Sequence, residues 1–129
     1  MDQKTALEQL ILSVQKPGRY VGGEPGSIVK DKNEVSLRFA FCFPDTYEIG
    51  MSHLGMKILY GLTNAQPNYA CERVFCPDTD MEQLMLEHQI PLYTLESLEP
   101  VADFDLIGFT LQYEMAYTNI LNMLHLAGI

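Results

Sequence analysis

The pattern of apolar and polar positions is clearest between Val35 and Leu62. Residues 35–43 (VSLRFAFCF) alternate large apolar side chains with smaller or polar ones, which is typical of a β-strand. From Leu54 onward, leucine and isoleucine recur at helical spacing, with Ser52 as the predicted N-cap and Gly50 supplying the unusual backbone angles of the intervening turn. A strand that enters a helix through a glycine-containing loop predicts half of a βαβ unit.

Strand-like and helix-like patterns alternate along the rest of the chain. The predicted elements are a helix over 4–15, a Gly/Pro-rich connector over 19–32, an edge strand over 70–76, a helix over 79–88 that starts in a capping box at Thr79, a buried strand over 105–111 and a helix over 114–126 that stops at Gly128. This order predicts an α/β fold: a doubly wound, mostly parallel sheet of the flavodoxin-like, cobalamin-binding-domain type, incomplete at its C-terminal side.

The chain divides into two expected parts. Residues 1–34 form an N-terminal helix and connector, and residues 35–129 form the front part of the α/β domain. In the strand order 2-1-3, the strand at 105–111 would expose an apolar edge where a fourth strand belongs. A second copy would cover this edge, so we expect a homodimer.

Composition and charge narrow the function classes. The chain has 129 residues, 47% of them apolar, and a net charge of −9, which fits one soluble domain. Residues 39–129 hold only two Lys/Arg against twelve Asp/Glu, so a nucleic-acid partner is not expected. No run approaches the roughly 20 apolar residues of a membrane helix, and the cytoplasm is the expected compartment. The three cysteines lack C-x-x-C spacing and are expected to be buried thiols.

Candidate chemistry gathers in the loop after the first strand. Asp45 to Gly50 spells D-x-Y-x-x-G, and ligands of open α/β sheets bind at the carboxyl ends of strands. The spacing resembles the D-x-H-x-x-G loop of cobalamin-binding domains, in which the His lies below cobalt, the Asp holds the imidazole and the Gly lets the loop turn. Tyr47 stands where that His would be. Because a phenol titrates near 10, the resemblance implies a cobalamin bound without a histidine ligand.

A second segment resembles the same family. Leu106 to Gln112 (LIGFTLQ) is similar to the strand that ends in S-x-L, whose hydroxyl lies against the nucleotide tail of the cofactor. Thr110 keeps the hydroxyl, whereas Gln112 departs from the Leu. The residues that the resemblance implies for cofactor binding are Asp45, Tyr47, Gly50, Ser52, Gly55, Thr110 and Gln112; no catalytic residue and no metal ligand is expected.

The whole chain, from KPGRYVGGE to LNMLHLAGI, is similar to the N-terminal segment of a family of bacterial radical SAM proteins with cobalamin-type leading domains. This resemblance implies that a radical SAM barrel, with an iron-sulfur cluster and S-adenosylmethionine, lies downstream and is the partner of this domain. No C-x-x-x-C-x-x-C occurs here, so the chain alone is not expected to be catalytic.

Three functions remain open at this point. The first is a cobalamin-binding-like domain that positions cobalamin or substrate for the barrel. The second is a cofactor-free module of the same fold that serves substrate docking or domain packing through the segment Arg19 to Glu24. The third, a receiver-like or flavin-binding domain, ranks last because Phe43-Pro44-Asp45 offers a single acid. Each residue also has a structural interpretation: Asp45 as a cap, Tyr47 as a packed aromatic, and Thr110 as a hydroxyl that satisfies a strand end.

Overall fold

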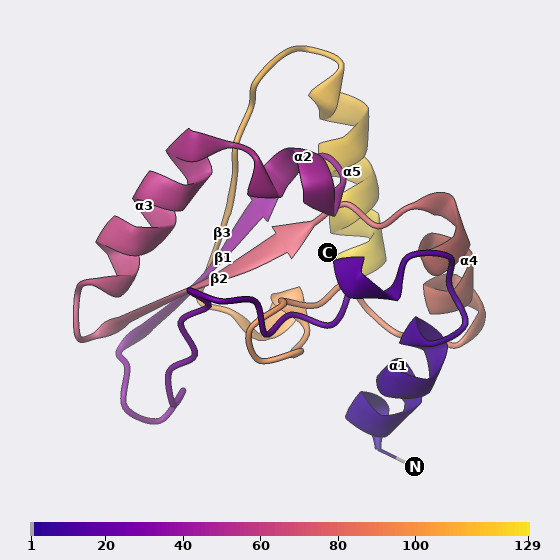
Figure 1. The fold of residues 1–129 in the computed structure, drawn as a ribbon, viewed down its shortest axis with the longest axis horizontal. Helices are drawn as coiled ribbons and strands as arrows, with labels where there is room; N and C mark the ends of the chain where they lie inside the picture. The colour runs from indigo at the N-terminus through magenta and orange to yellow at the C-terminus, as the bar shows by residue number, and fades with distance from the viewer. Residues whose placement is uncertain (1) are drawn as a thin grey trace.

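A three-stranded parallel sheet forms the centre of the molecule (Figure 1). The computed structural model describes residues 2–129. The strands are β1 (Leu37–Phe43), β2 (Tyr69–Phe75) and β3 (Leu106–Phe109), in the order β2-β1-β3. Phe43 is in register with Phe75, and Cys42 with Phe109, so the three strands end at one edge. The predicted α/β fold is confirmed, with a sheet consistent with an incomplete flavodoxin-like arrangement.

Helices connect and cover the strands. Their bounds are α1 (Gln3–Ile11), α2 (Tyr47–Met51), α3 (Leu54–Asn64), α4 (Thr79–Glu87) and α5 (Ala116–Ala127), with short 3₁₀ turns at Pro17–Arg19 and Val101–Asp103. Helix α3 packs on β2 and contacts α2, whereas α4 contacts α1 and α5. Because parallel crossovers are right-handed, these two groups cover opposite faces of the sheet. Within residues 2–129, no helix combines the length and apolar character needed to cross a membrane.

The core draws on both expected parts of the chain. Leu7 and Ile11 of α1 are buried together with side chains of the sheet, and Tyr20 of the connector joins them. The connector itself has little regular structure, as predicted, and Gly22 and Gly26 adopt positive φ there. Four methionines are fully buried at helix positions and fill the core: Met56, Met81, Met85 and Met123.

Three local predictions are wrong at helix starts. The glycine-containing loop predicted between β1 and the next helix is largely helical, because residues 47–51 form the short helix α2. The N-cap of α3 is His53, whose Nδ1 accepts a hydrogen bond from the Met56 amide at 3.1 Å. Ser52 instead ends α2, where its hydroxyl donates to the Glu48 carbonyl at 2.8 Å. Helix α4 starts one residue earlier than its capping-box pattern indicated. Its N-cap is Asp78 rather than Thr79, and the Asp78 carboxylate accepts a hydrogen bond from the Thr79 amide.

Strand β2 lies at an edge, as predicted, but its charges are not exposed. Glu72 and Arg73 are buried at 5% and 7% exposure. The Leu95 amide donates to the Arg73 carbonyl at 2.9 Å, so the segment after α4 runs along the free edge of β2. The Glu72 carboxylate accepts hydrogen bonds from Thr94 and Ser97 of that segment, both at 2.9 Å. Hydrogen-bond partners on neighbouring segments therefore satisfy these two charged side chains inside the protein.

Candidate functional site at the carboxyl edge of the sheet

The carboxyl edge brings together the two segments that the sequence singled out. The Thr110 amide donates to the Cys42 carbonyl at 3.1 Å, which places the residue after β3 beside the end of β1. Asn119 of α5 donates to the Pro44 carbonyl at 2.9 Å, and the Cys76 amide donates to the Asp45 carbonyl at 2.9 Å. The turn after β1 is thus held from both sides.

Asp45 closes the turn on itself. Its Oδ1 accepts a hydrogen bond from the Thr46 amide at 2.7 Å, and its own amide donates to the Phe43 carbonyl at 2.8 Å. Thr46, the N-cap of α2, makes no side-chain capping bond. The Asp45 carboxylate therefore has a local structural contact, with the amide of the next residue along the chain.

Tyr47 points into the protein. Its hydroxyl donates to Glu24 Oε1 of the connector at 2.9 Å, and its ring meets that of Phe75 edge-on with centroids 5.5 Å apart. Burial and the nearby Glu24 carboxylate raise the pKa of Tyr47 to about 12. At neutral pH the Tyr47 side chain is an uncharged phenol whose hydroxyl proton is engaged in the hydrogen bond to Glu24.

The two candidate glycines, Gly50 and Gly55, serve close packing. Gly50 lies inside α2 and is not among the residues with positive φ, so the expected turn conformation is wrong. A Cβ built on Gly50 would lie 2.1 Å from Cε1 of Phe75 and 3.2 Å from Cδ1 of Phe43. A Cβ on Gly55 would lie 3.0 Å from the His53 ring. Glycine lets α2 approach the ends of β1 and β2.

The remaining candidate residues differ in their surroundings. Ser52 and Gln112 are exposed, and Thr110 is half-buried. The Thr110 Oγ1 atom is itself buried and has no hydrogen-bond partner among the described residues. The expected strand-end hydrogen bond of this hydroxyl is therefore absent from residues 2–129, and Thr110 is the candidate with spare hydrogen-bonding capacity at this edge.

A buried ionic network lies behind Tyr47. Arg73 of β2 pairs with Glu24 at 3.0 Å and with Glu96 at 2.6 Å. Tyr60 of α3 donates to Glu96 at 3.0 Å. Burial by itself would raise the pKa of Glu24. Hydrogen bonds, of which that from Ser27 comes first, and the charge of Arg73 outweigh burial and lower this pKa to about 2. Burial instead raises the pKa of Glu96 above its ordinary value. The network fastens the connector to the sheet.

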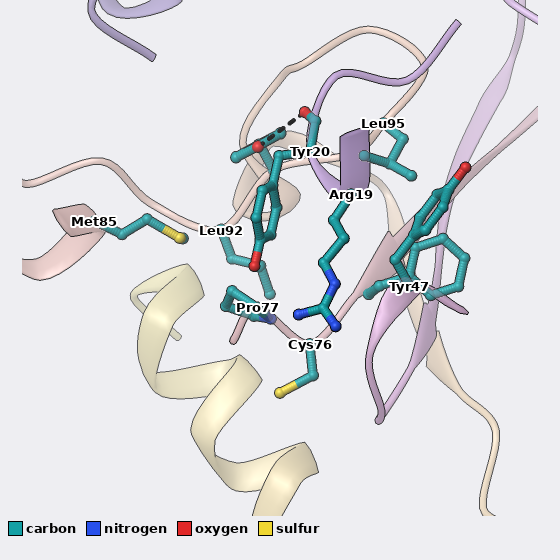
Figure 2. Close-up of a pocket in the computed structure, with 10 residues that line it drawn as sticks. Arg19, Tyr20, Tyr47, Cys76, Pro77, Met85, Leu92 and Leu95 are labelled. Atoms are coloured by element: carbon teal, nitrogen blue, oxygen red, sulfur yellow. Dashed lines mark hydrogen bonds between the residues drawn. The ribbon is translucent and has the colours of Figure 1, made fainter. Parts of the chain in front are cut away.

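A small cavity lies between the connector, α2 and the end of β2 (Figure 2). Its volume is about 20 Å³, which is room for about one water molecule. Arg19 points toward Cys76 in Figure 2, and its guanidinium pairs with Glu48 and Asp78, both at 2.8 Å. The residues of the cavity wall are Arg19, Tyr20, Tyr47, Phe75, Cys76, Pro77, Met85, Leu92, Tyr93 and Leu95.

Two further observations bear on chemistry at this edge. Within residues 2–129, no group of three or more His, Cys, Asp or Glu side chains is arranged to hold a metal ion. Cys42 and Cys71 are buried free thiols and Cys76 is half-buried. Burial raises the pKa of all three, that of Cys76 to about 11. The expectation of buried thiols is therefore confirmed for Cys42 and Cys71, whereas Cys76 is only half-buried.

Sequence comparison yields one family. A family model described as "Radical SAM proteins, N-terminal" matches residues 55–129, from the first turn of α3 through the end of α5. No curated protein and no solved structure matches this chain. The matched range includes Gly55, Thr110 and Gln112, whereas the D-x-Y-x-x-G turn precedes it.

Proposed function

Because this chain belongs to the radical SAM N-terminal family, we propose that it serves a radical SAM protein as a packing module that holds no cobalamin at its carboxyl edge. The iron-sulfur cluster and S-adenosylmethionine belong, in this proposal, to the radical SAM part of the protein. The chain's three cysteines do not form a C-x-x-x-C-x-x-C motif that could hold such a cluster. Its own contribution is to bind and orient that part.

The contact between Tyr47 and Glu24 carries the proposal. To reach a cobalt ion, Tyr47 would have to leave a 2.9 Å hydrogen bond to a carboxylate and its edge-on contact with Phe75. A charge-assisted hydrogen bond of this kind stabilises a protein by about 1.5–3 kcal/mol. The adjoining cavity of about 20 Å³ is far below the several hundred Å³ of ordinary ligand pockets. The turn as folded does not fit a cobalamin ligated through its aromatic residue.

A second function is favoured by one observation. The buried Thr110 Oγ1 has no partner among the described residues and lies at the same edge as Asp45. A cobalamin without a protein ligand to cobalt could use this hydroxyl for its nucleotide tail, with Gln112 beside it on the exposed segment. The residues that would hold it are Asp45, Ser52, Gly55, Thr110 and Gln112, with Tyr47 and Gly50 closing the turn beneath.

Titration with hydroxocobalamin, followed by its visible spectrum, distinguishes the two functions. The packing module predicts no spectral change with the wild-type protein. Saturable binding that weakens at least tenfold, or about 1.4 kcal/mol, in Asp45→Ala and in Thr110→Val would favour the cobalamin function instead. Tyr113→Phe is the matched control, because Tyr113 is exposed outside the candidate set.

A further inference from the structure

One acidic side chain of the connector points into the protein although its neighbours in the sequence face solvent. Pro25 and Gly26 are exposed, whereas the Glu24 side chain is only 16% exposed. The Ser27 amide donates to the Glu24 carbonyl at 3.0 Å, and Gly26 has a φ of 91°. Residues 24–27 (EPGS) therefore form a type II β-turn with proline and glycine at its two central positions. We call these four residues the Glu24 turn.

The Glu24 carboxylate fills a site made by two donors that lie outside the connector. Its Oε2 accepts a hydrogen bond from Arg73 Nη2 of β2 at 3.0 Å, and its Oε1 accepts one from the Tyr47 hydroxyl of α2 at 2.9 Å. Two charge-assisted hydrogen bonds, one to each oxygen, are well suited to a single carboxylate. The third donor, Ser27 Oγ, reaches Oε2 at 2.7 Å but belongs to the turn itself. If the turn moves away, the Arg73 and Tyr47 donors stay behind.

Arg73 is held in place by partners other than Glu24. Its Nε donates to Glu96 at 2.6 Å, its Nη1 lies 3.1 Å from Met51 Sδ, and its Cζ lies 4.9 Å from the centroid of the Tyr60 ring. These contacts leave Nη2 as the nitrogen that faces the turn. The fully buried Glu96 carboxylate already supplies one negative charge, so the site favours a ligand with a single negative charge over a more highly charged anion such as phosphate.

The pKa of Glu24 indicates which form of a carboxyl group the site prefers. Burial by itself would raise this pKa, but hydrogen bonds from Ser27 and Tyr47 and the charge of Arg73 hold it at about 2. At neutral pH the site therefore stabilises the carboxylate anion relative to the acid. A neutral amide would offer one acceptor oxygen and would point its own N–H groups at a donor.

The backbone around the Glu24 turn is free to swing. Gly23 and Gly26 have positive φ, and among the described residues nothing lies within 4 Å of a Cβ added at either position. Fixed points lie on both sides: a Cβ on Gly22 would lie 2.2 Å from the Leu95 carbonyl oxygen, and the Ile28 amide donates to the Tyr60 hydroxyl at 2.8 Å. Hinges of this kind consist of a few loop residues that absorb changes in φ and ψ.

We propose that Arg73 Nη2 and the Tyr47 hydroxyl form a binding site for the carboxylate of a small molecule, and that the Glu24 turn fills this site and lifts when the ligand binds. Without ligand, Glu24 is an internal competitor, which lowers the apparent affinity in proportion to the fraction of molecules whose turn is lifted. The proposal goes beyond the packing function and does not depend on it.

Acetate is the probe, and two-dimensional NMR of the arginine side chains detects its binding. The chain has three arginines, and the Nε–H signal of Arg73 is identified by its loss in Arg73→Lys. In Glu24→Ala, which empties the site, we expect acetate to shift this signal saturably while chloride keeps the ionic strength constant. The wild type should need at least about tenfold more acetate, because the turn competes. A folded Glu24→Ala variant without a saturable shift would overturn the proposal.

Further variants separate specific binding from a general effect of the salt. Tyr47→Phe, added to Glu24→Ala, removes one donor and should weaken acetate binding at least about tenfold. Tyr113→Phe, added in the same way, is the matched control, because Tyr113 is exposed, and should leave binding unchanged. Glu34→Ala removes an exposed carboxylate near the start of β1 and should respond as the wild type does. Equal acetate responses in Glu24→Ala, Glu34→Ala and the wild type would refute the site.

Pro25→Gly tests the lifting of the turn and does not require Glu24→Ala to fold. This variant keeps the carboxylate but loosens the turn, so it should bind acetate about two- to fivefold more tightly than the wild type. Circular dichroism checks that it folds. Acetate affinity equal to that of the wild type would contradict the proposal. The outcome is independent of the hydroxocobalamin titration, which reports on the carboxyl edge, so failure of one proposal is distinguishable from failure of the other.

Discussion

Replacing Gly50 by alanine tests whether this glycine is needed for packing. The new Cβ would lie 2.1 Å and 2.4 Å from two ring atoms of Phe75. Phe75 is 8% exposed and is held between Phe43 and Tyr47, with ring centroids 6.5 Å and 5.5 Å away. The ring therefore has little room to retreat, and overpacking of this kind costs about 1–3 kcal/mol.

Helix propensity acts in the opposite direction. Alanine is favoured over glycine inside a helix by up to about 1 kcal/mol, so the net loss for Gly50→Ala is expected to be about 1–2 kcal/mol. Gly61→Ala is the matched control, because Gly61 lies inside α3 and nothing lies within 4 Å of its added Cβ. That variant should gain about 0.5–1 kcal/mol.

Urea unfolding followed by circular dichroism measures both changes. We expect the midpoint of Gly50→Ala to fall and that of Gly61→Ala to rise, with the slope of the transition unchanged. If Gly50→Ala were as stable as the wild type or as Gly61→Ala, the close approach of α2 to Phe75 would be refuted.

Three further predictions concern the buried network. Tyr47→Phe should lose about 1.5–3 kcal/mol of unfolding free energy, because the hydrogen bond to the Glu24 carboxylate is lost while the ring contacts remain, whereas exposed Tyr113→Phe should change little; an unchanged urea midpoint for Tyr47→Phe would contradict this. Arg73→Met should lose about 3–5 kcal/mol, because it leaves the buried Glu96 carboxylate and the half-buried Glu24 carboxylate without their cation, and a midpoint within error of wild type would show that the network is not formed. The pKa of Glu24 falls from 4.5 to about 2 on folding, so its stabilising contribution is complete above pH 4.5 and is lost as the pH falls toward 2. The difference in unfolding free energy between wild type and Glu24→Gln should therefore become smaller from pH 7 to pH 3. A difference that stays constant would contradict the lowered pKa.

The sheet could be predicted because its signals are local. The alternation in β1 and the apolar run of β3 each lie within one short segment, and the strand order is the one assumed for this fold. The expectation of a buried strand over 105–111 is wrong, because β3 is limited to Leu106–Phe109 at an edge of the sheet and none of its side chains is buried. The stop at Gly128 was equally local: its φ of 77° is the left-handed C-cap that the sequence predicted. Such features depend on neighbours only a few residues apart.

The closure of the candidate site could not be predicted in this way. Glu24 lies 49 residues before Arg73 and 23 before Tyr47, so no spacing rule relates them. The D-x-Y-x-x-G pattern correctly marked the carboxyl edge of β1. The pattern is the same, however, for a tyrosine that hydrogen-bonds Glu24 and for one that faces a ligand. The exposed leucines of α3 also match a core-facing stripe, and only the fold shows which face they occupy.

Cobalt content measures most directly whether the carboxyl edge is closed to cobalamin. The protein would be folded in excess hydroxocobalamin, freed of unbound cofactor by gel filtration, and analysed for cobalt by mass spectrometry. We predict no cobalt above the buffer background in the wild type and in Asp45→Ala alike. About one cobalt per wild-type chain, lost in Asp45→Ala, would contradict the closed turn formed by Tyr47 and Glu24.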